Sequence, residues 1–113
     1  DFAAFGLDAS GEELWRYQDG TANVDWFYAA AMVDGDMSVV MVGGTKGNFS
    51  GTPSGRYDMV AVKLDAASGA EIWRNQEGTA RDQFFRDIAA TVDGGVVLVG
   101  YSDGDWSGPS AGG

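Results

Sequence analysis

The sequence contains no cysteine and no histidine among its 113 residues. Without cysteine the chain forms no disulfide, and it has no thiol nucleophile and no thiolate-ligated metal centre. Without histidine it lacks the most common general base and the most common metal ligand, and a serine or threonine nucleophile has no imidazole partner. Any metal ion bound by side chains would be a hard cation with oxygen ligands. These absences predict a protein that is not an enzyme.

Basic residues and long apolar runs are also scarce. Seven Lys and Arg stand against seventeen Asp and Glu, which gives a net charge of −10. Binding to nucleic acid or to an anionic membrane surface needs clustered basic side chains, so neither is expected. No run approaches the ~20 apolar residues that cross a bilayer. With 44% hydrophobic residues and eighteen Gly against two Pro, the composition indicates a folded, turn-rich domain instead of a disordered acidic tail.

The chain is made of two sequence repeats, which we place at 1–57 and 58–113. Six segments of the first repeat recur in the same order in the second, at an offset that drifts between 57 and 59 residues. So many ordered matches indicate an internal duplication. The matching pairs are Asp1–Asp8 with Asp58–Asp65, Ser10–Arg16 with Ser68–Arg74, Gln18–Ala22 with Gln76–Ala80, Val33–Gly35 with Val92–Gly94, Val39–Gly43 with Val96–Gly100, and Gly47–Gly51 with Gly104–Gly108.

Each repeat predicts four short strands. Apolar residues alternate over 59–64, which is the period of a strand and not of a helix. Further strands are predicted over 71–76, 84–92 and 96–101, with an Asp-Gly hairpin turn before the last. The alanine-rich segment Tyr28–Met32 could favour a helix, but its counterpart in the second repeat predicts a strand, so we expect a strand in both.

The strand count predicts an all-β fold of two four-stranded antiparallel blades of the β-propeller type, blade 1 over 1–57 and blade 2 over 58–113. Four strands in about 40–60 residues fit such a blade. An eight-stranded β-sandwich is the alternative. A sandwich would close by itself, whereas two blades would not, because propellers need at least four. The closing segment 108–113 looks like a connection to a third repeat, so we expect the chain to be an excerpt of a longer array.

The repeats resemble a known family, the SBBP-type (seven-bladed β-propeller) repeat. The likeness covers nearly the whole chain, and the residues that carry it in the second repeat are Asp58–Asp65, Ser68–Gly69, Trp73, Gly78 and Val96–Gly100. The resemblance implies blade architecture. A fold by itself implies no activity.

The stretch 63–73 also resembles the tryptophan-docking motif of PQQ-type propellers. In this sequence Lys63 stands where that motif has Ala, and Ser68 stands where it has Thr. The likeness therefore implies docking between blades and does not imply a quinone cofactor.

The resemblance implies a blade-docking role for Trp15 and Trp73, and for Asp8 and Asp65 in the turns before them. The physical chemistry of these residues fits that role. An aspartate followed by Ser-Gly suits a turn in which the carboxylate accepts backbone N–H groups. A tryptophan beside such a turn can bury roughly 150–250 Å² against a neighbouring blade while its N–H reaches a carbonyl.

Alternating carboxylates raise the question of calcium. Asp103 and Asp105 have the spacing that lets two carboxylates face one ion, and Asp34 and Asp36 share it. The complete twelve-residue calcium loop is absent. A solvated turn is the competing interpretation, so calcium at Asp103 and Asp105 is the single cofactor that we consider.

Acidic and aromatic residues form two further candidate groups. Four acidic residues lie in or near the loops that follow the tryptophan strands. Nothing in the sequence fixes two of them at the distance that separates the carboxylates of a glycosidase. Solvated loop acids, or ion pairs with Arg81 and Arg86, are therefore the simpler expectation. The aromatic residues are numerous, and we expect them mainly in the blade core, with an exposed docking surface as the alternative. The acids are Asp19, Asp25, Asp82 and Asp87; the aromatics are Trp26, Phe27, Tyr28, Phe49, Phe84, Phe85 and Trp106.

The sequence thus predicts a non-enzymatic structural or protein-interaction module. Its expected partners are other protein subunits or further repeats of its parent chain, contacted through sheet edges and the loops 45–57 and 102–113. Family resemblance and acidity point to a secreted or cell-surface assembly. The alternative is a ligand-binding propeller segment that holds calcium or a carbohydrate, or a part of a propeller enzyme.

Overall fold

The computed structural model describes residues 1–50, 57–78 and 83–102, and every regular element in these ranges is a β-strand. The all-β prediction is confirmed, and so is the prediction of four strands in each repeat. The alanine-rich segment belongs to a nine-residue strand. The strands are β1 (Phe2–Leu7), β2 (Glu13–Asp19), β3 (Asp25–Val33), β4 (Ser38–Thr45), β5 (Asp58–Asp65), β6 (Glu71–Glu77), β7 (Gln83–Ala90) and β8 (Val96–Ser102).

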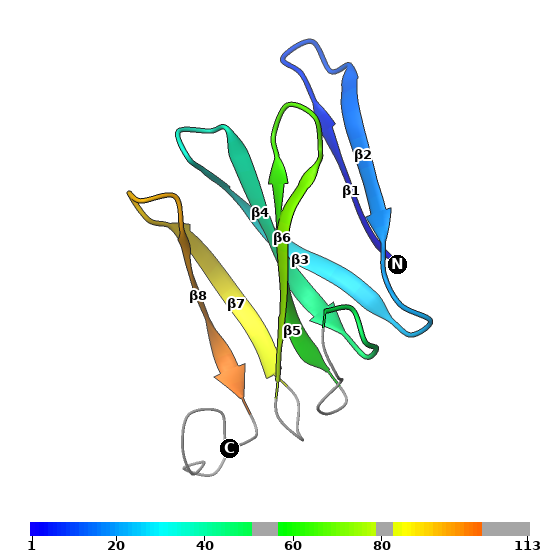
Figure 1. Cartoon of the computed structure of the whole chain (residues 1–113). Helices are drawn as coiled ribbons and strands as arrows, with labels where there is room; N and C mark the ends of the chain where they lie inside the picture. Colours follow the sequence, from blue (N-terminus) through cyan, green and yellow to red (C-terminus); the bar gives the residue numbers. More distant parts are fainter. Residues whose placement is uncertain (51–56, 79–82, 103–113) are drawn as a thin grey trace.

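The strands form three antiparallel sheets (Figure 1). β1 pairs with β2, the four strands β3 to β6 form a central sheet in sequence order, and β7 pairs with β8. The prediction that each repeat folds into its own four-stranded blade is therefore wrong. The central sheet takes β3 and β4 from residues 1–57 and β5 and β6 from residues 58–113.

The pairing of β4 with β5 explains this grouping. These strands join through eight consecutive residue pairs without a register shift, from Ser38 opposite Asp65 to Thr45 opposite Asp58. Both strands are apolar and almost wholly buried, so they occupy the middle of the sheet. A tandem repeat determines how often a structural unit recurs, but it does not determine the strand at which each sheet begins. Here the repeats begin at β1 and β5, whereas the four-stranded sheet begins at β3.

The central sheet lies between the two hairpins, and a hydrophobic cluster fills each interface (Figure 1). Alternate residues of β4 serve the two sides, since Val39 and Met41 face β1–β2 while Val40 and Val42 face β7–β8. The described strands thus form three layers rather than the two layers of a sandwich. The first cluster contains Phe2, Val39, Met41, Phe49, Val60, Val62 and Leu64; the second contains Val33, Val40, Val42 and Ala61, with Ile88, Val96 and Leu98 packed against them.

Candidate functional site

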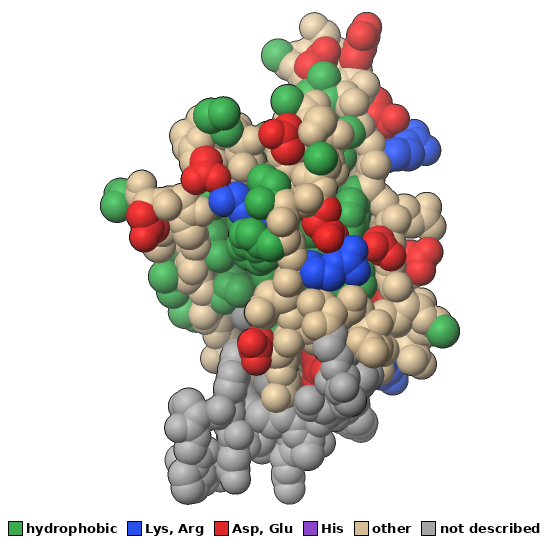
Figure 2. Space-filling view, in the orientation of Figure 1, with side chains coloured by type: hydrophobic (Ala, Val, Ile, Leu, Met, Phe, Trp, Pro, Cys, Tyr) green, Lys and Arg blue, Asp and Glu red, His purple; other side chains and the backbone are tan. Residues whose placement is uncertain are grey.

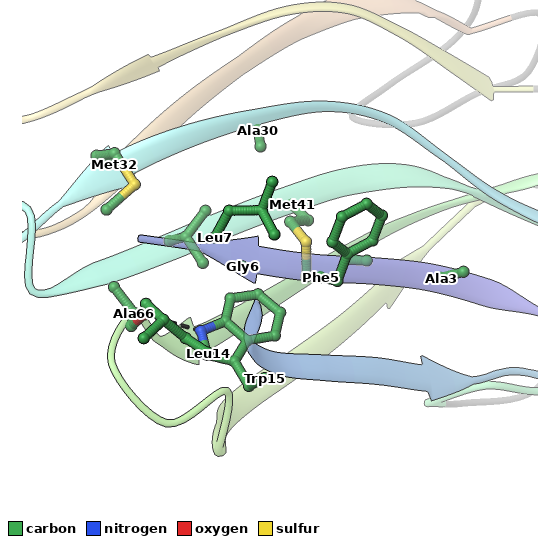
Figure 3. Close-up of a pocket in the computed structure, with 12 residues that line it drawn as sticks. Ala3, Phe5, Gly6, Leu7, Leu14, Trp15, Ala30, Met32, Met41 and Ala66 are labelled. Carbon is green, nitrogen blue, oxygen red and sulfur yellow. Dashed lines mark hydrogen bonds between the residues drawn. The ribbon is translucent and has the colours of Figure 1, made fainter. Parts of the chain in front are cut away.

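Trp15 connects the first hairpin to the central sheet. It projects from β2 toward the turn between β5 and β6, where its indole Nε1 donates a hydrogen bond of 2.8 Å to the carbonyl oxygen of Ala66 (Figure 3). The indole is partly buried against the first hydrophobic cluster. One side chain therefore contributes both apolar contact and a directional bond between two sheets.

Two glycines make room for this indole. A Cβ atom on Gly6 would lie 2.6 Å from Trp15 Cε2, and a Cβ atom on Gly69 would lie 2.7 Å from Trp15 Cγ and Cδ2. Gly69 also has a φ angle of +75°, which other residues adopt only with strain. The indole thus lies against backbone from its own hairpin and against backbone from the central sheet.

Asp65 holds the turn that receives the indole. Its Oδ1 accepts hydrogen bonds from the backbone N–H groups of Ala67 (3.0 Å) and Ser68 (2.9 Å), and from the Ser68 hydroxyl (3.1 Å). The bond from the Ser68 N–H is the main cause that lowers the pKa of Asp65 from its ordinary value. Asp8 performs the same task in the first repeat, where it accepts from Ser10 N (2.8 Å) and Glu12 N (3.0 Å).

Polar contacts between β2 and β6 border the docked tryptophan. The Tyr17 hydroxyl donates to Glu71 Oε1 at 3.0 Å, and burial followed by this bond raises the Tyr17 pKa. Arg74 donates to Asp19 Oδ2 and to Glu71 Oε1, each at 2.8 Å, and its guanidinium lies 4.0 Å from the centre of the Phe49 ring. The bond from Arg74 is the first cause of the lowered Asp19 pKa.

Trp73 is the repeat counterpart of Trp15, and its surroundings differ. It is 38% exposed on β6. It borders a groove of about 420 Å³, which the side chains of β5, β6 and β8 line, and Figure 2 shows hydrophobic side chains on the surface in this region of the molecule. Docking of Trp73 onto a neighbouring turn stays a prediction. The lining residues are Ala61, Trp73, Arg74, Asn75, Val96 and Leu98.

A second, more apolar groove of about 490 Å³ runs along the free side of β1 (Figure 3). Phe5 and Leu7 line it from β1, and Met32 and Met41 line it from the central sheet. Sequence reasoning missed this groove because the alternation of β1 is that of a core strand. The signal lies in the repeat alignment, since Phe5 and Leu7 correspond to Val62 and Leu64, which are fully buried.

The calcium prediction is not tested by the described residues. Asp103 and Asp105 lie outside them. Asp34 binds Lys63, with Oδ2 and Nζ 2.7 Å apart, and the hydrogen bond from Lys63 is the first cause of its lowered pKa. Lys63, at the motif position of Ala, also donates to the Gly94 carbonyl and so links the central sheet to the third. Within residues 1–50, 57–78 and 83–102 no cluster of three or more acidic side chains could hold a metal ion.

The acidic residues considered as a glycosidase pair have different partners where the structure describes their contacts. Asp19 binds Arg74. The Asp25 side chain is buried and accepts hydrogen bonds from Thr21 and Thr45. Asp87 lies on β7, and Asp82 lies outside the described residues, as does Arg81. Arg86 stacks on the Tyr101 ring.

The aromatic residues divide between core and surface. Phe27 and Phe49 each pack against the buried ring of Phe2, with ring centres 4.7 Å apart. Trp26 and Tyr57 form a T-shaped ring pair with centres 5.2 Å apart, while Tyr28 is exposed. Trp106 and the side chains of Phe84 and Phe85 lie outside the described part of the chain.

No protein-family model matches this sequence, and no curated protein matches it. In the part of the chain that the structure describes, no helix is long and apolar enough to cross a membrane.

Proposed function

We propose that the chain is a non-enzymatic structural and protein-interaction module of the β-propeller repeat type, which works within a secreted or cell-surface assembly. Its role is to stack sheets on one another and to offer their edges to neighbouring protein subunits or to further repeats. The observation that carries this proposal is the docking of Trp15 between Gly6 and Gly69, with its hydrogen bond to Ala66 in the turn between β5 and β6.

Two features support a stacking role, and a third disfavours an anionic polymer as partner. The sheets meet face to face through apolar clusters on both sides of the central sheet. Two of the three residues that make the docking site recur in the other repeat, since Trp73 and Gly11 match Trp15 and Gly69, while Lys63 stands at the position of Gly6. The surface carries scattered carboxylates, as Figure 2 shows, and the net charge of −10 disfavours an anionic polymer as partner.

A tandem fusion of two copies of the chain tests the proposal. In a repeat protein, stability is the sum of unit stabilities and interface terms, so joining two copies should raise the free energy of unfolding per copy. We expect the fusion to unfold at a higher urea concentration than the single chain. Unfolding at the same concentration would mean two independent domains and would contradict the module proposal. Calorimetry with calcium and with a glycan panel tests the ligand-binding alternative, for which we expect no binding heat.

A further inference from the structure

We propose that the chain associates head to tail with a second copy of itself, in which β1 of the second copy pairs antiparallel with the edge of β8 that pairs with no other described strand. The new sheet, in the order β7–β8–β1–β2, would reproduce the central sheet. This inference rests on the proposed function and deepens it by naming the partner as another copy of this chain.

The central sheet supplies the template for this joint. In the repeat alignment β8 corresponds to β4 and β1 corresponds to β5. β4 and β5 pair without a register shift, whereas among the described strands β8 pairs with β7 alone and β1 pairs with β2 alone. Transferring the pair Val42–Ala61 to the new joint places Val99 opposite Ala4 of the second copy. An unpaired edge presents N–H and C=O groups that such a strand would satisfy.

The groove beside Trp73 fits the arriving strand. In the central sheet, Val62 and Leu64 of β5 are fully buried against the first hairpin. Their counterparts Phe5 and Leu7 are 63% and 52% exposed. In the proposed joint these two side chains enter the groove of about 420 Å³ that Trp73 helps to line.

The apolar groove along β1 fits the other half of the joint. Val40 and Val42 of β4 are fully buried against the third sheet, while their counterparts Val97 and Val99 on β8 are each 53% exposed. When β8 pairs with β1 of the second copy, these valines face the groove of about 490 Å³ between β1 and the central sheet of that copy (Figure 3). The exposed side chains of β1 thus match the groove beside Trp73, and the exposed valines of β8 match the groove along β1.

The docking turn is repeated as well. Gly11 has a φ angle of +83°, close to the +75° of Gly69, and Asp8 holds its turn as Asp65 holds the other. A Cβ atom on Gly11 would meet nothing within 4 Å, so the face that Trp15 covers at Gly69 is open at Gly11. In the joint the Trp73 indole donates to the carbonyl of Ala9 of the second copy, the counterpart of Ala66, from a side-chain position that differs from that of Trp15, because Lys63 stands where the first repeat has Gly6.

The charges at the joint are complementary despite the net charge of −10. Arg74 of β6 binds Asp19 of β2 across the existing interface. The counterparts of this pair are Arg16 of the second copy and Glu77 of the first, which also have opposite signs. Arg16 is exposed, and its ion pair with Glu13 stays within its own hairpin, so the guanidinium can turn toward Glu77.

Site-directed crosslinking tests this joint, because the cysteine-free chain gives no background. One sample of the chain carries Val99→Cys and another carries Ala4→Cys. Residues opposite each other across an antiparallel pair have Cβ atoms about 4.5–5.5 Å apart, close to disulfide distance. Under mild oxidation the mixture should give a linked dimer several-fold more than either variant alone. Val99→Cys mixed with Leu7→Cys, which is also exposed but out of register, is the matched control.

Sedimentation of the unmodified chain gives an independent readout. We expect its average mass to rise with concentration, toward a ring or an open chain, since a heterologous contact repeats. A constant monomer mass up to high concentration would overturn the inference, as would equal crosslinking in the control mixture. Crosslinking of Val99→Cys with itself would indicate a symmetric β8–β8 contact and would also overturn it. A monomer whose tandem fusion is stabilised would leave the proposed function intact, so the two failures are distinguishable.

Discussion

The indole of Trp15 donates its hydrogen bond to the carbonyl oxygen of Ala66, which lies 51 residues further along the chain, in the turn after a strand of a different sheet. The contact joins β2 of one layer to the turn after β5 of the next. It therefore links the packing of two sheets to one side chain and one carbonyl group.

Replacing Trp15 should destabilise the chain far more than replacing Trp73. Trp15→Ala removes a docked aromatic side chain and one inter-sheet hydrogen bond, and we expect a loss of about 3 kcal/mol in the free energy of unfolding. Trp73→Ala should cost about 1 kcal/mol or less in dilute solution, because the side chain is exposed. Urea unfolding followed by circular dichroism measures both. Equal losses would contradict the docking role of Trp15.

Gly69→Ala and Gly11→Ala form a matched pair. Both glycines have positive φ angles, so an alanine at either position costs about 1–2 kcal/mol from backbone strain. At Gly69 the new Cβ atom would also lie 2.7 Å from the Trp15 indole, whereas at Gly11 it would meet nothing within 4 Å. We expect Gly69→Ala to cost roughly 1–3 kcal/mol more than Gly11→Ala. A difference near zero in thermal or urea unfolding would show that the indole does not lie on this turn.

Arg74→Met should weaken the contact between the first two sheets. The change removes the bonds to Asp19 and Glu71 and the stacking on Phe49. We expect a loss of about 1–2 kcal/mol, partly screened by salt. Arg16→Met is the control, since Arg16 is the repeat counterpart and its exposed ion pair with Glu13 lies within one hairpin, and it should leave the free energy of unfolding almost unchanged. Urea unfolding at low and high salt concentration checks both.

The stability of the chain should fall in acid, in part because of Asp25. Burial alone would raise the pKa of this carboxyl, but hydrogen bonds from Thr45 and Thr21 outweigh it and hold the pKa below its ordinary value. A carboxyl whose pKa is lower in the folded state stabilises that state above its unfolded pKa of about 3.9, and this contribution is lost as the pH falls through the folded pKa. Urea unfolding between about pH 7 and pH 3 should show the decline.

Variants at this site make the acid prediction specific. Asp25→Asn should lower stability at neutral pH and reduce the fall below about pH 4. Thr45→Val keeps the carboxylate but removes one donor, so it should reduce the same fall by a smaller amount. The other carboxyls with lowered pKa values leave part of the fall in place. An unchanged pH profile in Asp25→Asn would contradict the assignment. Those other carboxyls are Asp19, Asp34, Asp65 and Asp93.

The sequence predicted the strands well because their signals are local. Alternation over 59–64 and the repeat alignment identified all eight strands, including the alanine-rich one, where the alignment outweighed helix propensity. The grouping of strands into sheets failed for a physical reason. Pairing of β4 with β5 is a contact between repeats, and a duplicated sequence has the same period wherever the unit is taken to begin.

The candidate site was predictable in its parts but not in its arrangement. The turns at Asp8 and Asp65 follow from the tendency of aspartate to accept nearby N–H groups. The two tryptophans, however, have the same local sequence and different surroundings, because within the described chain only Trp15 has a further turn against its indole. Such a difference depends on which sheets are stacked, and no local pattern carries that information.

The two-strand offset between repeat and sheet has a mechanical consequence. A single repeat holds four strands, but as two separate hairpins, β1–β2 and β3–β4, and an isolated two-stranded hairpin is marginally stable in water. Among the described strand pairs, the one without a register shift therefore crosses the repeat boundary, where eight residue pairs join the end of one repeat to the start of the next. The central sheet is complete only when both repeats are present. A pulling force along the chain would therefore act on strands paired across the repeat boundary, and the repeats would not unfold as independent units.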